Sequence, residues 1–138
     1  MQRKFPKKKQ KKYSGKSALS NRKDASQYHL SVGNILRKHF GINSIQQEVY
    51  IDGQYIDWIL TTDDGLTIAI EVHGEQHYKA VDFGGNDASK AFESQQFRDR
   101  RKRLILAKRG IPLIEIPYWH AHDEEWILNE IEKRRRVD

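Results

Sequence analysis

Two acidic residues on neighbouring predicted strands carry the clearest chemical signal in the sequence. Residues 66–73 alternate between apolar and other side chains, which places Glu71 and His73 on one face of a strand. Residues 54–60 predict a preceding strand, and a glycine-bearing turn lays the two strands side by side. Asp57 then faces the same side as Glu71. Because unpaired charges are costly to bury and hard cations prefer oxygen ligands, this pattern predicts a divalent cation site.

The predicted ligands of one Mg²⁺ ion are Asp57, Glu71 and the backbone carbonyl of Val72, with Mn²⁺ expected to substitute. Such a cation lowers the pKa of a bound water and neutralises charge that builds up on a phosphate under attack. His73 and His77 are candidates for a general base or proton carrier, because imidazole titrates near neutral pH. The alternative for Glu71 and His73 is a structural hydrogen-bonded pair at a strand end.

A long helix predicted over residues 88–109 brings Asp99 and a dense run of cations to the same region. Asp99 neighbours Lys102 and Arg103 at helical spacing, and it could orient a histidine or a metal-bound water. Lys102, Arg103 and Lys79 could clamp the scissile phosphate. The predicted nucleic-acid contacts as a set are Lys7, Lys8, Lys9, Lys11, Lys12, Lys79, Arg98, Arg101, Lys102 and Arg103.

Composition narrows the class of protein. The chain has 138 residues, a formal net charge of +6 and no cysteine, which excludes disulfides, thiolate zinc sites and a cysteine nucleophile. No apolar run approaches the length of a membrane span, so we expect a cytoplasmic, DNA-associated protein without membrane contact. Residues 1–24 are rich in lysine and predict a flexible basic arm that touches phosphates, and residues 25–138 predict a single domain.

The pattern of elements predicts an α/β fold. The predicted elements are a helix over 26–40, strands over 45–51, 54–60 and 66–73, a helix over 88–109, a strand over 111–117 and a final helix capped by Asp123. A strand–helix–strand connection within one sheet is right-handed, which makes the last strand parallel to the strand of Glu71. In the long helix we expect apolar contacts from Phe92, Phe97, Leu104, Ile105 and Ala107. The result is a mixed four-stranded sheet flanked by helices, in the order αβββαβα.

This order of elements, with Asp on the second strand and Glu on the third, resembles the core of the PD-(D/E)XK nuclease superfamily. The likeness is closest to its very-short-patch-repair-like endonuclease branch, whose motif is Glu-x-Asp-Gly-x-x-His. Residues 71–77 correspond to that motif, Asp99 to the helical Asp before basic residues, and residues 110–114 to a Gly-Ile strand. The resemblance covers about residues 26–118. It implies a restriction-endonuclease-like core and magnesium-dependent hydrolysis of double-stranded or branched DNA.

Two positions depart from the pattern of that superfamily. His73 stands where the branch has an acid and the wider superfamily a lysine. The first predicted helix has no acidic residue where many members carry one, which leaves His29, Ser31 or Glu48 to take that place. The number of metal ions therefore stays open.

Three functions follow, in decreasing order of support. The first is a magnesium-dependent DNA endonuclease that acts on branched, nicked or mismatched DNA and would need a homodimer to cut both strands. The second is a catalytically inactive nucleic-acid-binding module on the same fold. The third is a zinc- or manganese-type hydrolase whose ligands would be His73, His77, His120 and His122 with Glu71.

Overall fold

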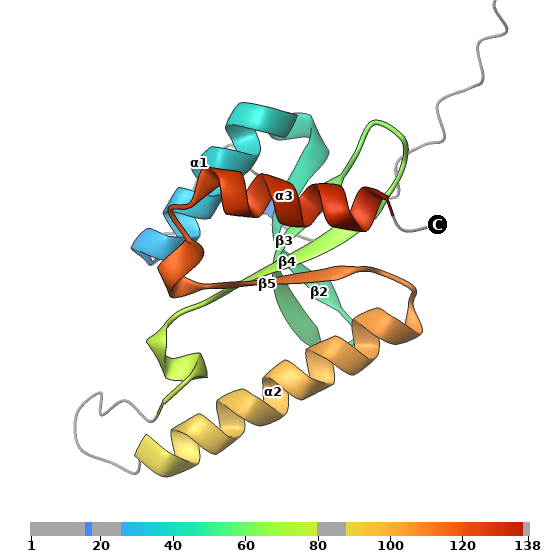
Figure 1. Cartoon of the computed structure of the whole chain (residues 1–138). Helices are drawn as coiled ribbons and strands as arrows, with labels where there is room; N and C mark the ends of the chain where they lie inside the picture. Colours follow the sequence, from blue (N-terminus) through green and yellow to red (C-terminus); the bar gives the residue numbers. More distant parts are fainter. Residues whose placement is uncertain (1–15, 18–25, 80–87, 137–138) are drawn as a thin grey trace, which may run out of the picture.

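A central sheet with helices on both faces forms the framework of the molecule (Figure 1). The computed structural model describes residues 16–17, 26–79 and 88–136. Within them the elements are β1 (Lys16–Ser17), α1 (Gln27–Phe40), η1 (Ile42–Ser44), β2 (Ile45–Ile51), β3 (Gln54–Thr61), β4 (Thr67–His73), η2 (Glu75–His77), α2 (Ala88–Lys108), β5 (Leu113–Pro117), η3 (Tyr118–His120) and α3 (Glu124–Arg135), where η marks a 3-10 helix. Helices α1 and α3 cover one face of the sheet, and α2 lies on the other.

The sheet has the topology that the sequence predicts. Strands β2, β3 and β4 form an antiparallel meander, and β5 pairs in parallel with β4 after the α2 crossover. The α/β class, the mixed sheet and the order αβββαβα are confirmed. Strand β1 is an addition, because residues 16–17 of the predicted arm pair with β2. The rest of the arm, residues 1–15 and 18–24, lies outside the described residues.

Local chemistry explains where the elements begin and end. The Ser26 side chain accepts a hydrogen bond from the backbone N–H of His29 and caps α1. Asp123 caps α3 in the same way, as predicted. Between β2 and β3, Asp52 and Gly53 both have positive φ, 47° and 89°, which is the requirement of a type I′ hairpin turn.

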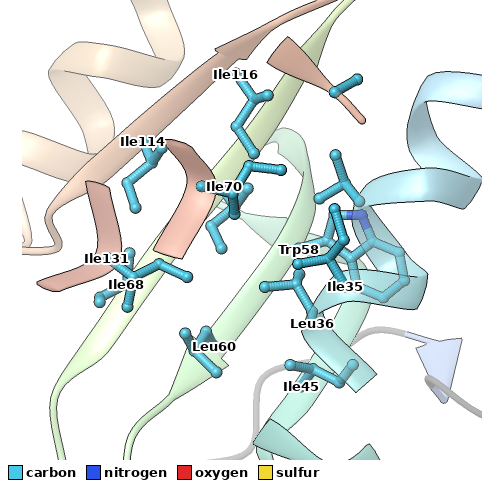
Figure 2. Close-up of a cluster of buried hydrophobic side chains, with 13 residues drawn as sticks. Ile35, Leu36, Ile45, Trp58, Leu60, Ile68, Ile70, Ile114, Ile116 and Ile131 are labelled. Atoms are coloured by element: carbon cyan, nitrogen blue, oxygen red, sulfur yellow. The ribbon is translucent and has the colours of Figure 1, made fainter. Parts of the chain in front are cut away.

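The larger apolar core lies between the sheet and the two helices α1 and α3 (Figure 2). Trp58 from β3 is fully buried there, among Leu36 from α1 and Ile70 from β4. Gly33 lets α1 approach the indole ring closely. A Cβ atom at residue 33 would lie 2.7 Å from Trp58 Cζ2, which is closer than two carbon atoms can pack. This contact fixes the position of Trp58, the residue of β3 that follows Asp57.

Helix α2 meets the sheet through an unexpected face. Of its residues, Asp99 and Leu106 are buried. The prediction that Phe97, Leu104 and Ala107 contact the core was wrong, since Phe97 is 58 % exposed, Leu104 71 % exposed and Ala107 also exposed. Positions 99, 102 and 106 form the stripe toward the sheet, so these three apolar side chains point elsewhere. Ile105 does pack against the second core, as predicted.

None of the helices formed by residues 26–79 and 88–136 combines the length and apolar character that crossing a lipid bilayer requires.

Candidate active site

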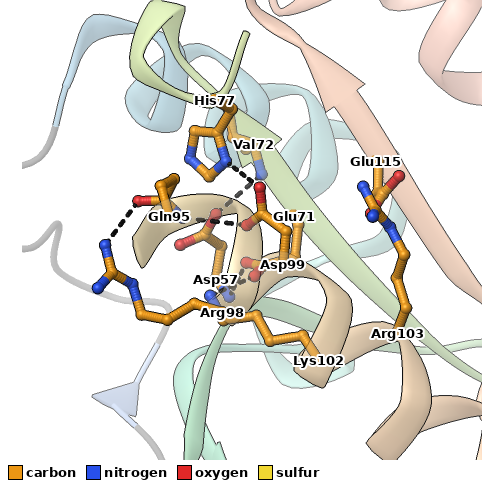
Figure 3. A network of polar contacts seen from close by, with 10 residues as sticks. All are labelled: Asp57, Glu71, Val72, His77, Gln95, Arg98, Asp99, Lys102, Arg103 and Glu115. Carbon is orange, nitrogen blue, oxygen red and sulfur yellow. Dashed lines mark hydrogen bonds and ion pairs between the residues drawn. The ribbon is translucent and has the colours of Figure 1, made fainter. Parts of the chain in front are cut away.

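Asp57 and Glu71 come together on the α2 side of the sheet (Figure 3). The backbone N–H of Asp57 donates to Glu71 Oε2 at 2.9 Å. In return, the backbone N–H of Val72 donates to Asp57 Oδ2 at 2.8 Å. These reciprocal bonds hold the two carboxylates side by side on neighbouring strands, which is the arrangement that strand alternation predicts. Val72 contributes its N–H to this arrangement, and a metal-ligand role for its carbonyl stays a prediction.

Glu71 is held by an ion pair inside the protein. Its side chain is 3 % exposed, and Lys102 Nζ lies 2.5 Å from Oε1. That oxygen makes no hydrogen bond within the described part of the chain, so the ammonium group is its electrostatic partner. Burial raises the pKa of Glu71 well above its ordinary value, the Asp57 carboxylate raises it further, and Lys102 opposes the rise. Two neighbouring carboxylates repel each other, so binding of a proton or a cation stabilises the pair.

Asp99 orients a histidine, as predicted, and that histidine is His77. Asp99 Oδ2 lies 2.9 Å from His77 Nδ1, and Gln95 Nε2 donates to Asp99 Oδ1 at 3.0 Å. Burial works against ionisation of Asp99, but the hydrogen bond and charge of His77 outweigh it and lower the Asp99 pKa. Because an ionised Asp99 can only accept, Nδ1 of His77 is the donor and Nε2 is left to accept a proton.

His73 packs face to face on His77. The ring centroids lie 4.1 Å apart and the planes differ by 7°. Burial, together with the charge of His77, lowers the pKa of His73 to about 4. The ring of His73 is therefore neutral near pH 7.

One nitrogen of His73, one nitrogen of His77 and one oxygen of Asp99 all lie within 4.8 Å of one another. The lone pairs of a ring lie in its plane, so two parallel stacked rings do not aim at one shared ion. As the side chains stand, the cluster is better suited to moving protons than to holding a metal.

The remaining predicted cations divide into paired and exposed groups. Three of them have polar partners: Arg103 with Glu115 at 2.5 Å, Lys79 with Glu75 at 3.4 Å, and Arg98 with Gln95 at 3.1 Å. Arg101 is exposed on α2. The predicted contacts Lys7, Lys8, Lys9, Lys11 and Lys12 lie outside the described residues. Binding of DNA by any of these cations stays a prediction.

The histidines near the C-terminus do not join the site. His122 Nδ1 lies 2.8 Å from Ser31 Oγ, and the ring of His120 stacks on Trp126. Among the described residues, the histidine and carboxylate side chains that do gather are His73, His77 and Asp99. The four-histidine zinc site is therefore not assembled.

Glu48 is the best placed substitute for the acid that the first helix lacks. The pairing of Gln47 with Trp58 and of Val49 with Ile56 puts Glu48 directly opposite Asp57. Its φ is 49°, a left-handed conformation that is uncommon for a non-glycine residue. His29, by contrast, is buried against the Trp58 ring at a centroid distance of 4.8 Å.

Two features of the site were not predicted from the sequence. Sequence reasoning assigned Lys102 to a phosphate, whereas the structure sets its ammonium beside Glu71. Gln95, which supports Asp99, was not singled out, although it stands one helical turn before Asp99 and that spacing is a usable signal.

Comparison with known proteins places the chain in a family. A protein-family model described as "Protein of unknown function (DUF2726)" matches residues 16–134. The chain belongs to the DUF2726 family. The match spans α1, α2, all but the last residue of α3, and all of the candidate site residues apart from the predicted arm lysines.

Part of this chain is similar in sequence to proteins of three viruses. This chain is 32 % identical over 66 residues to uncharacterized protein 307L of Invertebrate iridescent virus 6, covering 48 % of the chain and 33 % of that protein. It is 42 % identical over 53 residues to uncharacterized protein 094L of Frog virus 3, covering 38 % and 34 % respectively. The chain thus spans about a third of the length of these relatives. No solved structure matches it significantly.

Proposed function

We propose that this DUF2726 protein is a metal-dependent endonuclease that hydrolyses phosphodiester bonds in DNA. The observation that carries the proposal is the pair of reciprocal hydrogen bonds that holds Asp57 and Glu71 side by side. His77 from η2, held by Asp99 from α2, supplies a proton acceptor at the same end of β4. The resemblance to the very-short-patch-repair-like branch of PD-(D/E)XK nucleases supports the same reaction, and the net charge of +6 suits a polyanionic substrate.

The residues present fit a hard divalent cation. Asp57 and Glu71 offer oxygen ligands only, which is the donor set that Mg²⁺ prefers. The partner of Glu71 Oε1 is the Lys102 ammonium, and burial still holds the pKa of this carboxyl high, so the carboxylate pair favours a further cation. Asp57 and Glu71 would hold the cation, with the Val72 carbonyl as a further candidate ligand. When bound, Mg²⁺ lowers the pKa of a water and neutralises developing phosphate charge.

The side chains around the carboxylates have separate roles in the proposed reaction. Asp99 holds Nδ1 of His77, so Nε2 is the atom that takes a proton from the attacking water. His73 stays neutral and fixes the plane of the His77 ring by stacking on it. Lys102 brings a positive charge from α2 to the place beside Glu71. The positive charge that the wider superfamily has in a lysine at the position of His73 is therefore supplied here from the helix.

One observation favours the second candidate function, a DNA-binding module without catalytic activity. The Lys102 ammonium neutralises Glu71 at 2.5 Å, and a site stabilised in this way needs no metal. The two functions differ in one measurable respect, which is whether bound DNA is cut.

Cleavage of supercoiled plasmid and of a synthetic four-way junction tests the proposal. We expect nicking with Mg²⁺ or Mn²⁺, none with EDTA, and none from Glu71→Gln or Asp57→Asn. Glu75→Gln is the matched control, because Glu75 is a nearby exposed acid that pairs with Lys79 and not with the carboxylate pair. Equal cleavage by Glu71→Gln and the unaltered protein would refute the assignment. Tight, salt-sensitive binding without cleavage would establish the binding module.

A further inference from the structure

A set of aromatic rings borders the candidate site at the ends of β4 and β5. We call Tyr78, Tyr118 and Trp119 the aromatic surface. The ring of Tyr78 lies 6.1 Å from that of His73 and 4.9 Å from that of Trp119, and Trp119 lies 5.1 Å from Tyr118. Trp119 is 58 % exposed and Tyr78 43 % exposed. The rings therefore run from the catalytic histidines out to solvent.

The fold itself brings these rings to the site. Strands β4 and β5 are parallel, and their last residues, His73 and Pro117, are register partners. The short helix η2 follows β4 directly and leads to Tyr78, while η3 follows β5 and begins with Tyr118. Both segments thus leave the same edge of the sheet, two residues beyond Glu71 in β4.

The exposure of these rings calls for a ligand with flat apolar faces. Single exposed apolar residues are common, but a contiguous exposed set beside a polar site marks a binding surface. Its rim carries charges of both signs: Lys79 follows Tyr78 with a 61 % exposed side chain and pairs with Glu75, and Arg103 pairs with Glu115. Flat exposed rings beside a site proposed to hold a phosphate complement nucleobases joined by phosphates.

The faces of bases are accessible only where pairing is interrupted. In a continuous duplex each base face is covered by its neighbours, and proteins reach the base edges through the grooves. At an unpaired stretch the faces are open, and stacking on tyrosine or tryptophan then stabilises the complex with little dependence on base type. An exposed tryptophan beside the proposed cleavage site is therefore suited to bind DNA in which base pairing is interrupted, and not a regular duplex.

We propose that Tyr78 and Trp119 form a stacking site for unpaired bases of a DNA strand whose phosphate lies at Asp57 and Glu71. The inference rests on the proposed function, since it assigns to the same site a substrate class, namely DNA with unpaired bases beside the bond to be cut.

Equilibrium binding in EDTA tests this inference without requiring hydrolysis. The probes are a labelled, fully paired duplex and a duplex of the same length with a central unpaired bubble, so that both carry the same number of phosphates. We expect Trp119→Ala and Tyr78→Ala to weaken bubble binding about five- to a hundredfold and to change duplex binding by less than about twofold. Tyr50→Ala is the matched control, because Tyr50 is 49 % exposed and contacts Tyr55.

Two further measurements separate stacking from damage to the fold. Trp119→Phe keeps an aromatic face and is expected to restore most of the bubble affinity. Bubble DNA should also quench tryptophan fluorescence more than duplex DNA does, since Trp119 is exposed, whereas Trp58 is fully buried and Trp126 packs partly buried against the core. Equal losses on both probes, or no loss on the bubble, would overturn the stacking site.

The two proposals fail in different experiments. If Glu71→Gln cuts plasmid as well as the unaltered chain while the bubble preference depends on Trp119, the nuclease assignment is overturned and the stacking site stands. If cleavage depends on Glu71 but Trp119→Ala leaves bubble binding unchanged, only the stacking site is overturned.

Discussion

Replacing Gly33 with alanine probes the contact that sets β3 against α1. Glycine inside a helix costs about 1 kcal/mol relative to alanine, so propensity alone predicts that Gly33→Ala stabilises the protein. The structure predicts the opposite. The new Cβ would lie 2.7 Å from Cζ2 and 2.9 Å from Cη2 of Trp58, where ordinary contact begins near 3.4 Å.

The magnitude follows from how tightly the indole is enclosed. Trp58 is fully buried, His29 stacks on it at 4.8 Å and the Arg37 guanidinium lies 5.8 Å from its ring centroid. The ring has no free direction in which to move, so the cost belongs to the upper part of the 1–3 kcal/mol range for overpacked cores. After subtracting the gain in helix propensity, we expect a net loss of about 1–2 kcal/mol in the free energy of unfolding.

Urea unfolding of Gly33→Ala, Trp58→Phe and the double variant measures this contact. Trp58→Phe removes ring volume and so relieves the clash. It also removes an indole N–H that has no hydrogen-bond partner among the described residues. We expect the two substitutions to be coupled by about 1 kcal/mol or more in the double-mutant cycle. A Gly33→Ala variant as stable as the unaltered chain, together with zero coupling, would refute the close approach of α1 to β3.

Three further predictions concern the polar side chains of the site. Burial raises the pKa of Glu71 above its ordinary 4.5, so the folded state binds this proton more tightly than the unfolded state does. Without metal, the free energy of unfolding therefore falls as the pH rises from 4.5 towards the raised pKa. Urea unfolding in EDTA should therefore find Glu71→Gln more stable than the unaltered chain at about pH 7.5, with the advantage lost at about pH 4. Lys102→Met removes a cation 2.5 Å from Glu71 and should tighten Mg²⁺ binding in calorimetry. Lys79→Met, which removes a cation paired with Glu75, should leave Mg²⁺ binding unchanged. Equal Mg²⁺ affinities of Lys102→Met and the unaltered chain would contradict the competition between ammonium and metal. Asp99→Asn replaces the charged acceptor of His77 by a neutral amide and should slow cleavage about 10²- to 10⁴-fold with DNA binding unchanged. A loss below about tenfold would argue against the pair.

The sheet and the carboxylate pair were predictable from the sequence because short-range patterns encode them. Alternation in residues 66–73 placed Glu71 on one face, and the glycine-bearing turn before them set Asp57 beside it on the neighbouring strand. The Asp123 cap of the final helix is encoded locally in the same way.

The face of α2 was not predictable in the same way. Apolar residues normally mark the buried stripe of a helix, but here Asp99 and Lys102 occupy it while Phe97 and Leu104 are exposed. Polar burial of this kind depends on partners that are distant in the chain, such as His77 and Glu71. Local periodicity holds no information about those partners, so the ion pair of Lys102 could not be foreseen.

The way α2 is attached to the sheet has a consequence for how the site assembles. Leu106 is the one apolar side chain of this helix that is fully buried, and the contacts of Asp99 and Lys102 with the strand side are polar. Lifting such a helix costs less free energy than unfolding the core on the other face, where α1 and α3 insert several apolar side chains. The part of the site that α2 carries, Asp99 and Lys102, is thereby mounted on a helix held to the sheet largely by polar contacts. In the proposed function, a bound polyanion would act on these same charges.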